Sequence, residues 1–81
     1  MNERIRNQGY LAEARQEARS LRLRIESTRN SIREKLDPFA DIDTIDDATV
    51  AELAIQLGTA LADYREICAR ITALKNALGE R

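Results

Sequence analysis

The chain has 81 residues with no histidine or tryptophan, a third of them charged, and a net charge of -1 at pH 7. A chain this short forms one domain at most, and its apolar content is too high and its net charge too low for a disordered protein. No run of about 18 apolar residues exists, so we expect no membrane span, and the polar N-terminal stretch favours a cytoplasmic protein.

The first predicted element is an amphipathic helix over about residues 3–36. From Leu11 onward, small and apolar residues recur at alternating steps of three and four, which are the a and d positions of a heptad. Pro38 should end the helix, because proline disfavours helical geometry in the residue before it and has no N–H to donate. The positions of this seam are Leu11, Ala14, Ala18, Leu21, Ile25, Thr28 and Ile32.

An acidic turn is expected over residues 37–47, which hold five aspartates and the single proline. Three apolar residues, Phe39, Ile42 and Ile45, lie among these acids. This composition suits a connection whose apolar side chains plug the end of a helical bundle.

The second helix is predicted over about residues 47–78. Its start is ambiguous, because Thr44 with Asp47 and Thr49 with Glu52 both fit a capping box. Gly79 follows the last apolar position and suits a left-handed helix stop. The second seam consists of Val50, Leu53, Leu57, Ala60, Tyr64, Ile67, Ile71, Leu74 and Leu78.

The two seams predict an all-α fold: one antiparallel two-helix coiled-coil hairpin over residues 1–81. Folding the chain about Ile42 and Asp43 pairs residues whose numbers add to 85, and each a position then meets a d position. Large side chains meet small ones in several layers, which fills space without voids. Attractive charges also flank the seam in this register, with Glu17 opposite Arg70 and Arg24 opposite Asp63.

The second helix is apolar over a wider face than a two-helix seam needs. We therefore expect a homodimer, most simply a four-helix bundle of two hairpins. Alternatively, the aliphatic stems of arginines at e positions of the first helix shield this strip and the hairpin stays monomeric. The candidate dimer face consists of Ala54, Ile55, Leu61 and Cys68.

Arginines gather on one side of the first helix and form a candidate basic ridge, interrupted by Glu26. Such a ridge can bind a phosphate backbone, so an accessory role on nucleic acid is one functional hypothesis. However, the net charge is slightly negative and no aromatic residues interleave with the arginines, which favours a solvated or partner-facing ridge. Its members are Arg15, Arg19, Arg22, Arg29 and Arg33.

Neither a metal site nor catalytic machinery is expected. Asp41, Asp43, Asp47 and Glu52 fit four positions of a calcium-binding EF-hand loop, but Asp46 occupies the position that requires glycine. Without histidine, and with no serine or cysteine beside a plausible base, nucleophilic catalysis has no visible residues. We therefore predict no cofactor and a non-enzymatic structural or protein–protein interaction module.

The segment 21–39 carries a resemblance to a known group of proteins. The resemblance rests on Ser31-Ile32-Arg33 leading into the turn Leu36-Asp37-Pro38-Phe39, together with Ala77-Leu78-Gly79, and the turn is the one distinctive motif. With these motifs the chain resembles small uncharacterised helical-hairpin proteins encoded by Mu-like phages and prophages. The resemblance implies a bacterial or phage origin and a small accessory role, and it supplies no catalytic or binding residues.

Overall fold

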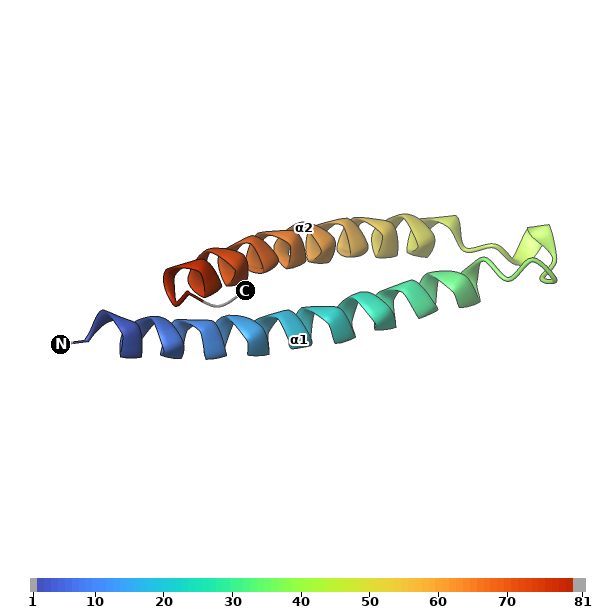
Figure 1. The fold of residues 1–81 in the computed structure, drawn as a ribbon. Helices are drawn as coiled ribbons and strands as arrows, with labels where there is room; N and C mark the ends of the chain where they lie inside the picture. The colour runs from blue at the N-terminus through green and yellow to red at the C-terminus, as the bar shows by residue number, and fades with distance from the viewer. Residues whose placement is uncertain (1, 80–81) are drawn as a thin grey trace.

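The computed structural model describes residues 2–79 and consists of two long helices that run side by side (Figure 1). α1 spans Glu3–Lys35, the short 3-10 helix η1 spans Ile42–Thr44, and α2 spans Asp47–Ala77. The chain turns at one end of the molecule, so α1 begins and α2 ends at the opposite end. The result is an antiparallel hairpin with extents of 62 × 18 × 14 Å. The all-α hairpin expected from the two seams is confirmed.

The core lies between the two seams. Within the described residues, the buried apolar side chains and the one buried polar side chain, Thr28, all occupy predicted a or d positions. One cluster of Ala14, Leu21 and Ile67, with Tyr64 and Ile71 packed against it, agrees with the expected register of the two helices. The buried apolar residues are Leu11, Ala14, Leu21, Ala60, Ile67 and Leu78.

The charge pairs predicted beside the seam are not formed. Glu17 and Arg70 line the same depression, together with Asp63, but no ion pair forms among these described residues. Exposed ion pairs gain little free energy because water screens them and two long side chains must be held in one geometry. Apolar packing therefore sets the alignment of the helices.

Hydrogen bonds hold the end of the rod where α1 begins. The side chain of Asn2 accepts a hydrogen bond of 2.9 Å from the backbone N–H of Arg4, which caps α1. Arg4 then donates from Nη1 to the carbonyl oxygen of Leu78, 3.3 Å away. A cation at a helix C-terminus is favourable because unpaired carbonyls gather there. Gly79 follows with φ of 76°, so the predicted left-handed stop is confirmed.

The start of α2 differs from both predicted capping boxes, because the capping residue is Asp46. Its side chain accepts hydrogen bonds from the backbone N–H of Thr49 at 3.2 Å and from the Thr49 hydroxyl at 2.6 Å. Thr44 instead belongs to η1, and its hydroxyl donates to the carbonyl oxygen of Asp41 at 2.7 Å. Thr49 is therefore the third residue of α2 and donates to the capping residue, whereas the sequence offered it as a capping residue itself.

The prediction that the turn plugs the end of a bundle is wrong for the single hairpin. We call residues 36–46 the tip. Phe39 is 93% exposed, and Ile42 and Ile45 are also exposed. Local hydrogen bonds set the path of the tip, including one from the Phe39 N–H to the Asp37 side chain. Two helices alone enclose no space at their end that a side chain could fill.

Candidate interaction surfaces

The predicted dimer face on α2 divides into two parts. Ala54 and Ile55 are exposed, and Ile55 keeps 71% of its surface accessible. Leu61 and Cys68 are half-buried in the single chain, because each keeps an intermediate fraction of its surface accessible. The hairpin therefore covers part of the apolar strip that the sequence assigned to a partner, and it leaves Ala54 and Ile55 uncovered.

The heptad register explains this division. Leu61 and Cys68 occupy e positions, which flank the seam, whereas Ile55 occupies an f position on the outer side of α2. The e positions of α1 on the same flank are arginines, Arg22 among them. A partner that packs against this flank must desolvate those guanidinium groups, while a partner that packs against the outer side of α2 need not.

A small residue close to Ile55, Gly58, leaves room for another helix to pack on α2. Gly58, one turn further along α2, would carry an added Cβ into open space, with no heavy atom within 4 Å. A glycine inside a helix costs about 1 kcal/mol relative to alanine. In the single hairpin no neighbouring side chain packs on Gly58, so a helix packed on α2 could approach closely there.

The arginine ridge runs along one exposed flank of α1. All five of its members are exposed, and their spacing places them within one face of the helix. Glu26 is exposed on the same face and lowers its positive charge locally. The ridge residues are Arg15, Arg19, Arg22, Arg29 and Arg33.

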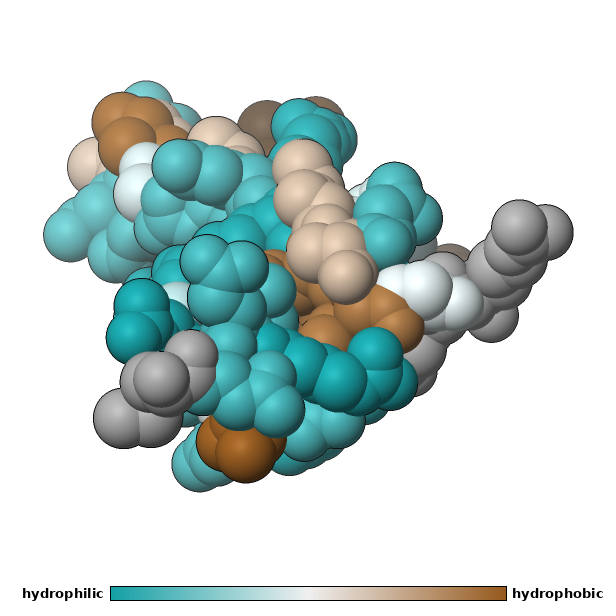
Figure 2. Space-filling model, turned by 60° about the vertical axis from the view of Figure 1, so that its left-hand side comes forward, coloured by the Kyte–Doolittle hydropathy of each residue, from teal (hydrophilic) through white to brown (hydrophobic). Residues whose placement is uncertain are grey.

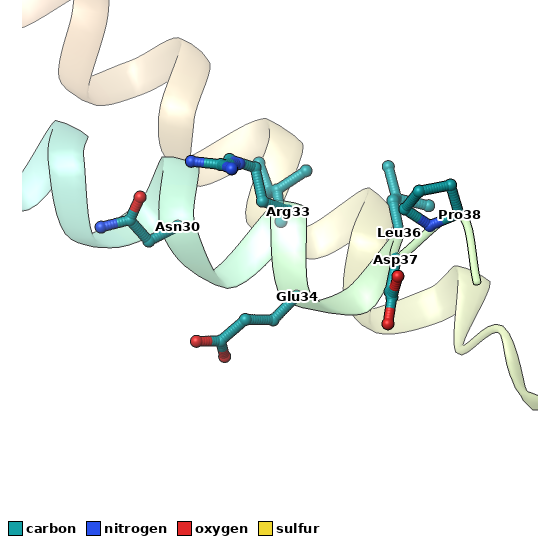
Figure 3. Close-up of a pocket in the computed structure, with 7 residues that line it drawn as sticks. Asn30, Arg33, Glu34, Leu36, Asp37 and Pro38 are labelled. Carbon is teal, nitrogen blue, oxygen red and sulfur yellow. The ribbon is translucent and has the colours of Figure 1, made fainter. Parts of the chain in front are cut away.

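A wide depression of about 750 Å³ lies where α1 ends (Figure 3). Leu36 and Pro38 form its apolar side, and Arg33 and Asp37 supply opposite charges. Figure 3 shows the Glu34 carboxylate directed away from the chain's second helix, so it faces solvent. The depression is open and mixed in character, which suits contact with another macromolecular surface better than enclosure of a small molecule.

The tip combines exposed apolar side chains with five nearby aspartates over residues 37–47 and no basic residue. The Thr49 hydroxyl and then the Thr49 backbone N–H donate to Asp46, and these bonds lower the pKa of that carboxyl below its ordinary value. Within residues 2–79 the acids of the tip do not form a group of three or more that could hold a metal ion. The aspartates therefore act as surface charge, and Asp37 and Asp46 also accept hydrogen bonds from backbone N–H groups, Asp46 as the cap of α2.

Three further features bear on function. No helix in the described part of the chain is long and apolar enough to cross a membrane. Cys68 is a free thiol of intermediate exposure, and its carbonyl oxygen accepts a hydrogen bond from the Thr72 hydroxyl. On the face seen in Figure 2 the surface is mostly hydrophilic, with small separate hydrophobic patches.

Comparison of the chain with protein-family models, with curated proteins and with solved structures finds no match. The surfaces described above are therefore the basis for assigning a function.

Sequence reasoning placed the α2 face and the arginine ridge but missed the tip as a surface. The sequence places Phe39, Ile42 and Ile45 in the turn, where we expected them to plug the end of a bundle. The signal that could have revealed their exposure is the aspartates that flank them in the sequence. Burying these apolar side chains would also have removed neighbouring carboxylates from water, which costs free energy.

Proposed function

We propose that this chain is a non-enzymatic interaction module: a helical hairpin that self-associates along α2 and presents its remaining surface to another protein. The observation that supports this most directly is the exposure of Ile55 on the outer side of α2, beside Ala54 and the open space at Gly58. Burying an exposed isoleucine contributes about 1.5 to 3 kcal/mol. Two hairpins joined in this way form a dimer of four helices.

The small core of the single hairpin supports the same proposal. Within residues 2–79, six apolar side chains are buried, and two of these are alanines. Domains of this size commonly need a partner, a metal or disulfides for stability, because little of their surface is hidden on folding. With one cysteine and no expected metal, a second copy is the simplest source of further burial. The sequence resemblance suggests a small accessory protein of a phage or prophage, and we propose that it acts in the cytoplasm.

Light scattering at micromolar concentration tests the proposal. We expect a mass about twice the 9.2 kDa of one chain. Ile55→Arg should weaken self-association at least about tenfold, which corresponds to about 1.4 kcal/mol. Leu23→Arg is a matched control, because Leu23 is 69% exposed on α1, away from the proposed face. A monomer mass for the unaltered chain, or equal effects of the two variants, would contradict the proposal.

The alternative function is binding of nucleic acid through the arginine ridge, favoured by the exposure of all five arginines on one helix face. Fluorescence anisotropy with a labelled DNA duplex measures it. Binding through the ridge should weaken steeply as salt rises, and replacing Arg22 and Arg29 with glutamine should reduce the slope of log affinity against log salt by about two. A salt-sensitive affinity in the micromolar range or tighter would rank this function first.

A further inference from the structure

The hairpin carries opposite charges at its two ends. We divide the described chain halfway along the rod, into a tip half, residues 23–63, and an open half, residues 2–22 and 64–79. The tip half has four basic and nine acidic residues, a net charge of -5. The open half has eight basic and four acidic residues, a net charge of +4. The charges are therefore separated along the 62 Å axis of the rod and not only between the two helices.

Exposed apolar side chains are also present at both ends. Phe39 and Ile42 lie at the tip, and Ile5 and Tyr10 lie on the first turns of α1 in the open half. These four side chains are exposed in the single hairpin. The start of α1 and the turn between the helices lie at opposite ends of the rod (Figure 1). Each end thus offers an apolar contact, one with acidic and one with basic surroundings.

We infer that two copies of this chain associate side by side and antiparallel, so that the tip half of each lies along the open half of the other. This inference rests on the proposed self-association along α2 and specifies its direction. A two-fold axis perpendicular to the rods produces such a pair and leaves no unpaired copy of the interface. The partner is a second hairpin, selected by complementary charge and by apolar side chains at matching ends.

Electrostatics disfavours the parallel alternative. A parallel pair would set two tips next to each other, each with five aspartates in or beside it and no base within residues 37–47. At physiological salt, charges interact over about 8 Å, so neighbouring tips would repel and charges on distant parts of the rods would be screened. Complementary surfaces determine orientation more than affinity, and here they favour the antiparallel pair.

Pulsed electron paramagnetic resonance on the 81-residue chain tests the direction of the pair. A spin label is attached at position 40 in an Ala40→Cys, Cys68→Ser variant, because Ala40 is exposed at the tip. In the antiparallel pair the two labels should lie more than about 40 Å apart, approaching the 62 Å length of one hairpin. In a parallel pair they would lie within about 20 Å, roughly two helix diameters.

The outcomes separate the inference from the proposed function. A dimer mass with a long distance supports both. A dimer mass with a short distance overturns the antiparallel inference and leaves self-association standing. A monomer mass with no intermolecular distance overturns the proposed self-association itself, and the inference with it.

A charge variant provides a second test, because it should change the dimer affinity in opposite senses for the antiparallel and the parallel pair. Asp43 is exposed in η1 and is not a helix cap. Asp43→Lys should weaken an antiparallel dimer about two- to fivefold at low salt, the range for exposed charge contacts, and strengthen a parallel one. The effect should shrink in 0.5 M salt because the added ions screen it. Tighter dimerisation of Asp43→Lys at low salt would overturn the inference.

Discussion

The open half and the tip of this hairpin contain similar apolar side chains, but those of the open half are buried and those of the tip are exposed. In the open half, Leu11, Leu21 and Ile67 are buried between the helices. At the tip, Phe39 and Ile42 are almost entirely exposed. The difference is the presence of a facing surface, because a seam residue meets a second seam across the hairpin and a tip residue meets none. Burial in this fold follows from pairing and not from residue type.

The contrast continues along the helices. Five of the six buried apolar residues lie in the open half, and Ala60 alone lies in the tip half. The buried position of α1 closest to the tip is Thr28, whose expected neighbour Leu57 remains half-buried. We therefore expect the free energy of unfolding to depend more on the open half, with a gradual loss of packing toward the tip.

The largest expected effect comes from the open half. Ile67→Ala should lower the free energy of unfolding by about 2 to 5 kcal/mol, because it removes buried methyl groups and leaves a cavity. Leu57→Ala in the tip half should cost less than half as much, since its side chain is already partly in water. Urea unfolding followed by circular dichroism, at one fixed protein concentration, measures both. Equal losses would contradict the gradient of packing along the rod.

The same contrast explains which parts of the fold could be predicted from the sequence alone. The seam positions could be predicted because heptad spacing determines which side of a helix each residue occupies, whatever its neighbours do. The path of the tip and the cap of α2 could not. Three nearby candidates, Thr44, Asp46 and Thr49, all have suitable side chains, and the backbone angles of the loop decide which one accepts the N–H.

The α2 face shows a second limit of sequence reasoning. Heptad letters identified Leu61 and Cys68 as apolar residues beside the seam, but they did not give the fraction that α1 already shields. That fraction depends on how closely the two helices approach and on where long side chains of α1 extend. Exposure of Ile55, at an outer position, followed more directly from the spacing.

An intermediate effect is expected at the junction between the tip and α2. Asp46→Ala should lower the free energy of unfolding by about 1 kcal/mol, because two hydrogen bonds from Thr49 to the cap are lost. Asp43→Ala is the matched control, since Asp43 is also an exposed acid but caps neither α1 nor α2. Thermal unfolding at neutral pH measures both variants, and equal losses would show that charge and not capping is responsible.

The same cap should make stability depend on pH. Because the folded state lowers the pKa of Asp46, the unfolded chain takes up a proton more readily. The cap's contribution is therefore present above the ordinary pKa of an aspartate and is lost as pH falls through the lowered value. In Asp46→Ala this part of the acid destabilisation should be missing. An unchanged difference between parent and variant from neutral to strongly acid pH would contradict this assignment.

The smallest expected effect on folding is at the tip itself. Phe39→Ser should change the free energy of unfolding by no more than about 0.5 kcal/mol, because a side chain that is 93% exposed loses no packing when it is shortened. The measurement is made at a protein concentration low enough for monomers, so that only contacts within one hairpin contribute. At higher concentration the same substitution should weaken self-association, since the antiparallel pair places this side chain beside the open half of a second copy. A loss above about 1 kcal/mol in the monomer would mean that Phe39 packs against its own hairpin, and the contrast between paired seam and unpaired tip would then fail.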